Sequence, residues 1–475
     1  MTSSIEDIGD RTFDLAVIGA GSAGFSAAIS ASEAGANVAL IGSGTIGGTC
    51  VNVGCVPSKT MIRAGEALHL ASTPQRFAGI STNGRLEDWR VVVAEKNALV
   101  TELRQAKYES LLPEYSSVHY LEGSAALSGA GLSVGGKPLQ ADATIIATGS
   151  SPLIASIPGI DGVDCLTSTS ALELLELPRS MMILGGGYIG VELGQMFARF
   201  GVEVTIVCRS RLLPQAEPEI SEALAGYLEQ EGLRIVAGIE YRSIMESGDG
   251  SVVLSVMKNG ESQQIESERV LLTTGRHPNT AGMGLAEAGV ELDGRGAVIV
   301  DDRMRTSRPG IYAAGDVTGR DEFVYMAAYG ARIAAENAMN GDSRSYDNFA
   351  MPAVVFTDPQ MASVGLTEAA AKAAGHSVKT SVLPLSAVPR ALAARDTRGL
   401  IKLVADTESD RLLGGHILAP EGADSIQTVV MALKAGFTVR QLAETIFPYL
   451  TTVEGLKLAA QTFDMDVSKL SCCAG

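Results

Sequence analysis

Four of the six cysteines in this chain stand in two pairs, and each pair could act as a dithiol. Cys50 and Cys55 lie near the beginning, in GGTCVNVGCVPSK, and Cys472 and Cys473 are adjacent near the end, in SKLSCCAG. A soft, two-coordinate metal ion needs two thiolates to bind it and two more to take it over. In a reducing compartment, a pair with the spacing of Cys50 and Cys55 is expected to be catalytic rather than structural.

The spacing within each pair indicates what its thiols can do. Four residues separate Cys50 from Cys55, so the two sulfurs can meet at the start of a helix, where the dipole and free N–H groups favour a thiolate. Adjacent cysteines such as Cys472 and Cys473 form only a strained small-ring disulfide. Two mobile thiolates on a tail suit capture and transfer of a soft ion, with an incidental cysteine pair as the alternative.

A predicted βαβ unit precedes the first pair. Residues 13–18 indicate a buried strand, followed by the loop GAGSAG, a helical run that ends at Gly35, and the strand NVALI. Gly19, Gly21 and Gly24 permit a tight turn, close approach to a pyrophosphate and close packing of helix on strand. Unpaired N–H groups at the helix start suit the phosphates.

The same unit recurs further along the chain. Strand SMMIL leads into GGGYIG, a helix and strand VEVTIV, and Gly185, Gly187 and Gly190 repeat the glycine spacing. Two such loops predict two bound dinucleotides. At the end of the second strand an acidic residue would suit a ribose 2′-hydroxyl, whereas arginine suits a 2′-phosphate. Arg209 and Arg211 therefore favour NADPH, with two solvated arginines as the alternative.

Other segments complete the predicted organisation. TIIATGS (144–150) and VLLTTGRHPN (270–279) each end a strand in a Thr-Gly turn, and IYAAGDVTG places Asp316 where its carboxylate can accept from a sugar-like hydroxyl. After residue 346, strands alternate with helices and no phosphate loop is present, which predicts a third, α+β domain. The length of 475 residues agrees with two or three domains.

Composition excludes several classes of protein. The net charge is −17, from 37 basic and 54 acidic residues, which argues against nucleic acid or an anionic membrane surface as the main partner. No apolar run is long enough to span a bilayer, and the start, MTSSIEDIGD, lacks the pattern of a secretory signal. We expect a cytoplasmic protein without membrane insertion. Its acidity indicates ordinary solubility or adaptation to high salt.

With these residues in view, the chain resembles the FAD-dependent pyridine nucleotide–disulfide oxidoreductases over almost its whole length. The match is carried by GAGSAG, by CVNVGC with Pro57 and Lys59, by GGGYIGVE, and by the ATG and AAGD segments. The resemblance implies an α/β fold with two Rossmann-like domains and a C-terminal α+β dimerisation domain. It places FAD in 1–155 and 281–345, NADPH in 156–280 and the dimerisation domain in 346–475. It also implies a homodimer with shared active sites.

The resemblance assigns roles to several side chains. Cys55 is implied as the thiolate against the flavin, and Cys50 as the exposed partner that meets the substrate. Lys59 and Glu192 match the pair near flavin N5, with a surface lysine and a helix-face glutamate as the alternative. Tyr188 is expected to cover the flavin where nicotinamide docks, although it could be a packing tyrosine.

Contacts to the two cofactors are implied at many positions, with one departure. These positions are Gly19, Gly21, Gly24, Gly44, Gly48, Thr49, Lys59, Ala125, Thr148, Gly149, Asp316, Val324, Gly185, Gly187, Gly190, Arg209, Arg211 and Gly275. The departure is Gly42, which stands with Ser43 where the family pattern has Glu or Asp at the end of the second strand. The adenosine ribose of FAD loses its expected acceptor there.

The C-terminal segment decides the expected activity. Disulfide reductases of the family carry His-Pro…Glu here, whereas this chain has Tyr449 at the histidine position and keeps Glu454; no histidine follows His416. A phenol with a pKa of about 10 is a poor proton shuttle at neutral pH, although it can ligate or hydrogen-bond near a metal. PYLTTVEGLKLAAQTF and LSCCAG resemble the branch of the family that reduces mercuric ion.

That resemblance implies reduction of Hg(II) to elemental mercury with NADPH and FAD. The implied metal ligands are Cys50, Cys55, Cys472, Cys473 and Tyr449, and the implied donors of Hg(II) are its thiol carriers. Many relatives in this branch carry an N-terminal metal-binding domain, and we expect a chain that begins directly at the flavoprotein core. The alternatives are a dihydrolipoamide- or glutathione-type disulfide reductase and a metal-sequestering protein without turnover.

Overall fold

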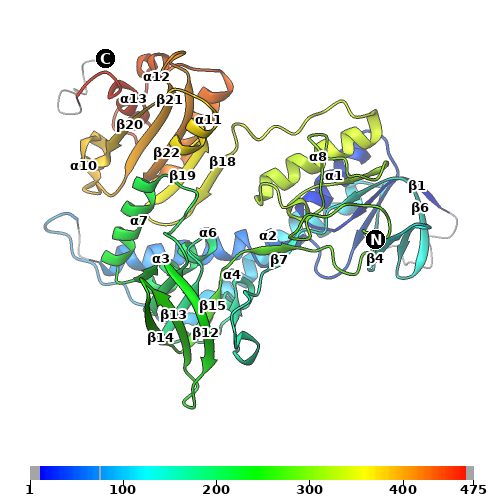
Figure 1. The fold of residues 1–475 in the computed structure, drawn as a ribbon, viewed down its shortest axis with the longest axis horizontal. Helices are drawn as coiled ribbons and strands as arrows, with labels where there is room; N and C mark the ends of the chain where they lie inside the picture. Colours follow the sequence, from blue (N-terminus) through cyan, green and yellow to red (C-terminus); the bar gives the residue numbers. More distant parts are fainter. Residues whose placement is uncertain (1–10, 74–75, 467–475) are drawn as a thin grey trace.

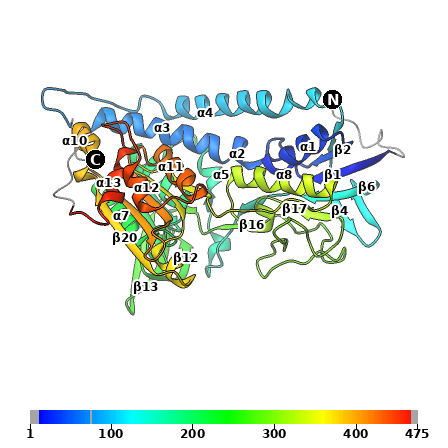
Figure 2. The ribbon, with the colours of Figure 1, turned by 90° about the horizontal axis from the view of Figure 1, so that it is seen from above.

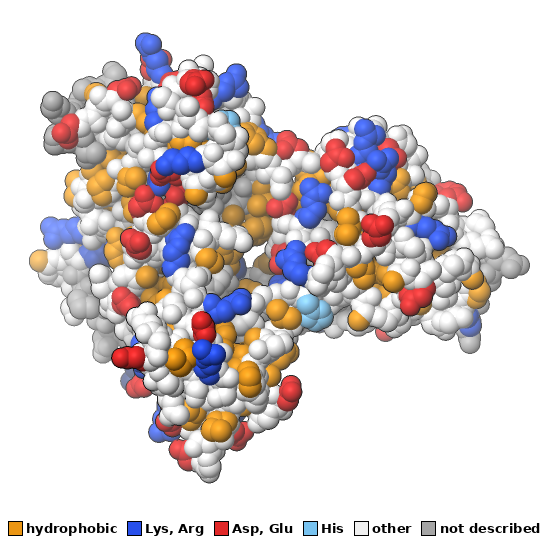
Figure 3. Space-filling view, in the orientation of Figure 1, with side chains coloured by type: hydrophobic (Ala, Val, Ile, Leu, Met, Phe, Trp, Pro, Cys, Tyr) orange, Lys and Arg blue, Asp and Glu red, His pale blue; other side chains and the backbone are white. Residues whose placement is uncertain are grey.

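The computed structural model of the protein describes residues 11–73 and 76–466. Its three large sheets lie in three lobes, the first at the right of Figure 1, the second below and the third at the upper left. On the face shown in Figure 3, acidic and basic side chains are interspersed, with no broad stripe of one sign. No helix within the described residues is long and apolar enough to cross a membrane.

The first lobe contains a seven-stranded sheet. Its strands are β1 (Thr12–Ile18), β2 (Val38–Gly42), β3 (Val118–Glu122), β4 (Ala125–Ser128), β5 (Gly131–Val134), β6 (Lys137–Ile146) and β17 (Ile311–Ala313). The order β3-β2-β1-β6 is parallel, and β5 and β4 continue the sheet as an antiparallel extension of β6. β17 pairs with β6, so the segment of the chain that follows the second nucleotide unit returns to the first sheet. Helices α1 (Ser22–Glu33) and α8 (Val324–Asn340) lie side by side (Figures 1 and 2).

The second lobe repeats the parallel arrangement. Its sheet has the order β11-β10-β9-β15-β8. The bounds are β8 (Leu166–Thr167), β9 (Ser180–Leu184), β10 (Glu203–Cys208), β11 (Arg234–Ala237) and β15 (Arg269–Leu272), with helices α5 (Ser168–Ala171), α6 (Tyr188–Arg199) and α7 (Pro218–Gln230). An antiparallel sheet of β12 (Ile239–Glu246), β13 (Val252–Lys258) and β14 (Glu261–Ser267) projects from it (Figure 1). β7 (Ser150–Pro152) and β16 (Arg276–Pro278) pair where the chain passes between the two lobes.

The third lobe is an antiparallel sheet covered by helices. Its order is β18-β19-β22-β21-β20. The strands are β18 (Pro352–Val355), β19 (Gln360–Gly365), β20 (Val378–Pro384), β21 (Leu400–Asp406) and β22 (Leu412–Ala419), and the helices are α9 (Glu368–Ala373), α10 (Pro389–Ala394), α11 (Gly422–Lys434), α12 (Val439–Glu444) and α13 (Glu454–Gln461). The predicted fold class is confirmed, whereas the domain boundaries stay a prediction.

Three helices after the first unit carry the chain across the molecule. They are α2 (Gly48–Asn52), α3 (Cys55–Ser72) and α4 (Trp89–Arg104), and Figure 2 shows α4 lying along α3. A short π-helical turn, η2 (Gln105–Glu109), ends α4. The ring of Trp89 packs against Phe200 with centroids 5.0 Å apart, which ties α4 to the end of α6. The long helices thus connect the first and second lobes.

Buried charges connect the second and third lobes. Arg199 on α6 binds Glu231 and Asp358, each at 2.8 Å. Lys402 on β21 is 1% exposed, and its ammonium lies within 3.0 Å of Glu217 Oε2 after α6. Removing one partner from such a pair would leave a buried charge uncompensated, which is strongly destabilising. The lobes are therefore held in a defined arrangement.

Candidate active site

The glycines of the first loop stand at positions that leave no room for a side chain. Gly19 has φ +122°, and a Cβ there would lie 2.2 Å from the carbonyl oxygen of Ala147. A Cβ on Gly24 would lie 1.7 Å from Gly19 O, so helix α1 packs directly on the loop. Gly21 is the N-cap of α1 and supplies no capping side chain. The first N–H groups of the helix are therefore available to an anion, as a pyrophosphate requires.

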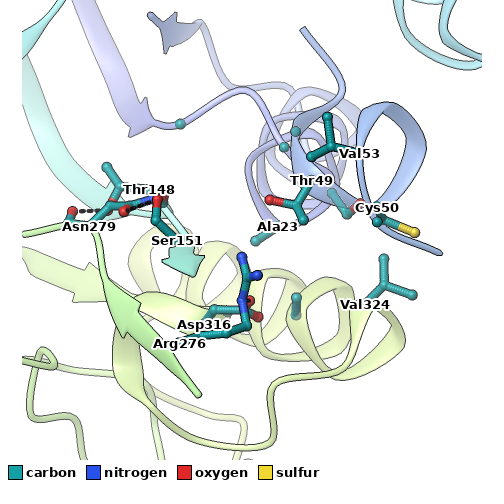
Figure 4. A pocket seen from close by; sticks show the side chains of 18 of the residues that line it. Ala23, Thr49, Cys50, Val53, Thr148, Ser151, Arg276, Asn279, Asp316 and Val324 are labelled. Carbon is teal, nitrogen blue, oxygen red and sulfur yellow. Dashed lines mark hydrogen bonds and ion pairs between the residues drawn. The ribbon is translucent and has the colours of Figure 1, made fainter. Parts of the chain in front are cut away.

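A cavity of about 1050 Å³ extends from this loop to the cysteine pair. This volume is at the upper end of the range for small-molecule pockets, and it suits a dinucleotide. The predicted residues that line it are Gly19, Gly21, Gly44, Gly48, Thr49, Cys50, Cys55, Lys59, Ala125, Thr148, Gly149, Tyr188, Glu192, Asp316 and Val324. Gly24 does not line the cavity, because its role is the close packing of α1. Figure 4 shows Thr49 and Cys50 across the cavity from Asp316 and Val324.

Asp316 is held by neighbours from β7 and β16. Ser150 Oγ donates to its carboxylate at 2.8 Å, and Arg276 Nε donates to Ser150 Oγ at 2.7 Å. The Arg276 guanidinium lies 3.9 Å from the carboxylate. Asp316 can therefore accept hydrogen bonds from hydroxyl groups in the cavity (Figure 4). Arg276 was missed by the sequence analysis, because its contact depends on the β7–β16 pairing.

The two cysteines have different proton affinities. Cys50 lies on α2, and Cys55 is the first residue of α3. A hydrogen bond from the Cys50 thiol and the charge of Lys59 lower the pKa of Cys55 and burial raises it, with a net pKa of about 7. The same hydrogen bond and burial raise the pKa of Cys50 well above its ordinary value. The first thiolate of the pair therefore forms at Cys55 near neutral pH, while Cys50 keeps its proton.

Lys59 and Glu192 meet in the cavity, as the family resemblance implies. Lys59 Nζ lies 2.6 Å from Glu192 Oε2, and the backbone N–H of Phe356 donates to Oε1 at 2.8 Å. The Lys59 ammonium also lies 5.0 Å from the centroid of the Phe356 ring. Glu192 is 6% exposed. Its carboxylate thus joins α3, α6 and the start of the third lobe at the cysteine pair.

Two tyrosines approach this region. Tyr188 is the first residue of α6, and its ring centroid lies 5.9 Å from that of Phe323. Burial raises its pKa, so its hydroxyl stays neutral. Tyr108, which sequence reasoning missed, lies on η2, packs edge-on against Phe25, and places its hydroxyl 3.3 Å from Ser22 Oγ. No motif marks Tyr108, since it reaches the first loop from a distant helix.

The glycines of the second loop lie outside the large cavity, although Tyr188 within that loop lines it. Gly185 has φ +118°, and a Cβ there would lie 2.4 Å from Thr273 O. None of Gly185, Gly187, Gly190, Arg209, Arg211 and Gly275 lines the large cavity. Arg209 is exposed beside this loop, whereas the Arg211 guanidinium donates to the carbonyls of Pro214 and Ala216, at 3.0 and 2.7 Å. The loop therefore presents Arg209 more openly than Arg211.

The C-terminal residues of the prediction lie elsewhere. Tyr449 is 55% exposed, and Glu454 is the buried first residue of α13, where its carboxylate accepts from the N–H of Leu450 at 3.1 Å. Figures 1 and 2 both place α13 in the third lobe, apart from α2. Within one chain, neither Tyr449 nor Glu454 lines the cavity that contains Cys50 and Cys55. Cys472 and Cys473 lie outside the described residues.

Comparison with known proteins gives consistent matches. The family model "Pyridine nucleotide-disulphide oxidoreductase" matches residues 13–335, and its dimerisation-domain model matches residues 351–460. Mercuric reductase from Bacillus cereus is 48% identical over 99% of this chain and 75% of its own length. Mercuric reductases from Staphylococcus aureus and Streptomyces lividans are each 46% identical, covering 100% and 98% of this chain and 86% and 98% of their own.

A solved structure matches at the level of the whole fold. The Cu(II) complex of the HOCl-induced flavoprotein disulfide reductase RclA from Escherichia coli superposes with a TM-score of 0.83. It is 31% identical and covers 95% of this chain and 99% of its own. The three-lobed arrangement thus recurs in a flavoprotein that reduces disulfides.

Proposed function

The chain belongs to the pyridine nucleotide–disulphide oxidoreductase family, and from that premise we propose that its reaction is the reduction of Hg(II) to elemental mercury by NADPH, with FAD as the resident cofactor. The resemblance inferred from its motifs is thereby confirmed. The reaction balances as NADPH and Hg(II) giving NADP⁺, a proton and Hg(0). We place it in the cytoplasm.

The polarised cysteine pair is the observation that supports this reaction most directly. Cys55 is a thiolate near neutral pH, because its pKa is lowered to about 7, and Cys50 is a thiol at hydrogen-bonding distance. Hg(II) prefers two soft sulfur ligands. Binding of Hg(II) to the thiolate form of Cys55 displaces no proton, and loss of the Cys50 proton completes a two-thiolate site.

The surrounding residues fit FAD along the cavity. The glycine cradle, the α1 N-terminus and Asp316 offer anion and hydroxyl contacts of the kind that a dinucleotide needs. When bound, FAD accepts a hydride from NADPH and supplies the electron pair that reduces Hg(II). Lys59 and Glu192 fix the charge beside the cysteines, and Tyr188 covers the entry from the second loop. As the metal takes up the electron pair, both Hg–S bonds break and two thiolates remain.

The second half of the site is proposed to come from a partner subunit. A chain with this dimerisation domain forms a homodimer. We propose that Tyr449 of one subunit faces Cys50 and Cys55 of the other, and that Cys472 and Cys473 receive Hg(II) from its thiol carriers. Stepwise exchange between thiolates keeps the metal bound at every stage, so no free ion is released.

Steady-state consumption of NADPH tests the reaction. We expect turnover with Hg(II) in excess thiol and release of volatile Hg(0), and little turnover with lipoamide or glutathione disulfide. Cys50→Ala should abolish Hg(0) release. Turnover with a disulfide but not with Hg(II) would instead support the disulfide reductase alternative, which the likeness to RclA favours. Binding of Hg(II) without NADPH consumption would support a sequestering protein.

A double variant tests the delivery step. Cys472→Ala/Cys473→Ala should keep FAD and the dimer but fail to take Hg(II) from a tightly binding dithiol, while keeping much activity with the bromide complex. Equal rates for the variant and the unaltered chain with dithiol-bound Hg(II) would overturn the role of this pair. Loss of activity with bromide as well would place the pair in the reduction site itself.

A further inference from the structure

The side chain of Tyr120 fills the place where the first nucleotide unit lacks its acidic residue. Gly42 ends β2 and lines the large cavity. A Cβ built on Gly42 would lie 2.7 Å from Tyr120 Oη and 2.8 Å from Ala20 Cβ. These distances are too short for any side chain. The position is therefore glycine because a hydroxyl from the neighbouring strand already occupies the space.

Strand pairing explains how Tyr120 reaches this place. β3 runs parallel to β2, with Tyr120 opposite Leu40 and Glu122 opposite Gly42. Tyr120 is only 7% exposed, and its ring packs in the core formed by β1, β2, α1 and α8. Its hydroxyl extends along the sheet toward the end of β2. A residue of β3 thus presents a polar atom at the end of β2.

The Tyr120 hydroxyl has no hydrogen-bond partner within residues 11–73 and 76–466. Tyrosine generally bonds its hydroxyl when its ring is buried, and Tyr120 lines a cavity from which a partner can come. Burial and the charge of Glu122 raise the pKa of Tyr120, so the group is a neutral O–H that can both donate and accept. A ligand hydroxyl is a matching partner for it.

The surroundings indicate which ligand that is. Tyr120 lines a second cavity, of about 540 Å³, which shares Gly44 and Thr45 with the large cavity. Gly44 and Thr45 follow the strand end at which a Rossmann unit places its ribose contact. A ligand with phosphates on the Gly19–Gly24 loop therefore brings its adenosine ribose to this junction.

We propose that Tyr120 Oη hydrogen-bonds a hydroxyl of the adenosine ribose of FAD, replacing the carboxylate that the family pattern has at position 42. The proposal rests on the proposed function, because it needs FAD in the large cavity. It converts a charged contact from β2 into a neutral contact from β3. Ribose recognition is thereby kept without a carboxylate at position 42.

Affinity of the apoenzyme for FAD and two analogues tests the proposal. The analogues carry 2′-deoxyadenosine or 3′-deoxyadenosine, and binding is followed by quenching of flavin fluorescence. Loss of one neutral hydrogen bond weakens binding about five- to tenfold. We expect this loss for Tyr120→Phe with FAD, and for the unaltered chain with one deoxy analogue. Tyr120→Phe should bind that analogue and FAD equally well.

Tyr312→Phe is the matched control. Tyr312 is also a buried tyrosine of the first sheet, but its hydroxyl lies 3.2 Å from Asp342 and not at the cavity. This variant should keep the unaltered discrimination between FAD and the analogue. If Tyr120→Phe still discriminates, or if the unaltered chain binds both analogues as well as FAD, the proposal is wrong. Failure of every chain to bind FAD would instead overturn the proposed function.

Discussion

The two glycine loops of this chain have the same backbone and different strand ends. Gly19 and Gly185 have φ values of +122° and +118°, and a Cβ on either would lie within 2.4 Å of a carbonyl oxygen. Gly24 and Gly190 each pack against the first glycine of their own loop. Contact with a pyrophosphate depends on these backbone positions alone, so both loops keep them.

The difference lies where each unit meets a ribose. The first unit ends in Gly42, crowded by Tyr120, and the second in Cys208 followed by exposed Arg209. Cys208 is buried, its thiol donates to Ser210 O at 3.1 Å, and burial raises its pKa to about 11. The two units therefore share the backbone positions that suit phosphate, whereas the side chains at their ribose-binding strand ends differ.

The largest effects should come from breaking either loop. Gly19→Ala places a Cβ 2.2 Å from Ala147 O, and Gly185→Ala places one 2.4 Å from Thr273 O, each at positive φ. We expect Gly19→Ala to weaken FAD binding about a hundredfold or more. Gly185→Ala should keep FAD but lose reduction by NADPH in stopped flow. Gly129→Ala, with no atom within 4 Å of its Cβ, is the control. Loss of FAD in Gly185→Ala would contradict the division between the loops.

A smaller effect should separate the two arginines after the second loop. Arg209→Gln should lower kcat/KM for NADPH about ten- to a hundredfold and leave that for NADH nearly unchanged, because a charge-assisted contact to the 2′-phosphate is lost. Arg211→Gln should affect both nucleotides alike, since its guanidinium binds carbonyls of its own loop. Steady-state kinetics with both nucleotides measure this. Equal kcat/KM values for NADPH and NADH in the unaltered chain would refute the NADPH assignment.

Crowding at Gly42 should appear as lost stability. Gly42→Ala brings a methyl group 2.7 Å from Tyr120 Oη, and overpacking of this kind costs about 1–3 kcal/mol. The melting temperature of the FAD-bound enzyme should fall. In the double variant Gly42→Ala/Tyr120→Phe part of that loss should be recovered, because the nearest atom is gone. An additive loss in the double variant would show that Ala20 alone sets the limit.

The smallest expected effect concerns the thiolate between the two units. Lys59→Met removes a positive charge that lowers the pKa of Cys55, so that pKa should rise from about 7 toward its ordinary value. The thiolate exists above the pKa, so less of it remains at neutral pH. The rate of Cys55 alkylation in the reduced enzyme can be measured by peptide mapping at a series of pH values. The midpoint of its pH dependence should shift to higher pH in this variant. Lys137→Met, an exposed change on β6, should leave the profile in place.

Much of this comparison was predictable from the sequence. Glycine spacing reports backbone requirements directly, so both loops, the cysteine pair and Asp316 followed from local patterns, whereas Thr148 and Val324 in the cavity lining followed from the family resemblance. The departure at Gly42 was visible, but its cause was not. Tyr120 lies on the next strand of the sheet, and nothing in a linear pattern sets that register.

Other contacts were hidden for related reasons. Arg276 and Phe356 reach the site through strand pairing and a neighbouring lobe, and Tyr108 through a helix that crosses the molecule. Arg211 was predicted as a phosphate ligand beside Arg209, yet its guanidinium closes its own loop. The antiparallel sheet of β12, β13 and β14 gave no signal in the motifs. Long-range pairing, and not residue type, limited the prediction.

The carboxylate of Glu192 connects three parts of the chain. One oxygen binds Lys59 after the first unit, the other binds the backbone of Phe356, and the residue itself belongs to the second unit. Electron transfer between two bound nucleotides depends on their spacing to within ångströms. Glu192 is one of the contacts that hold the two units at a fixed spacing. Residues 59, 192 and the turn at 356 are therefore constrained to change together.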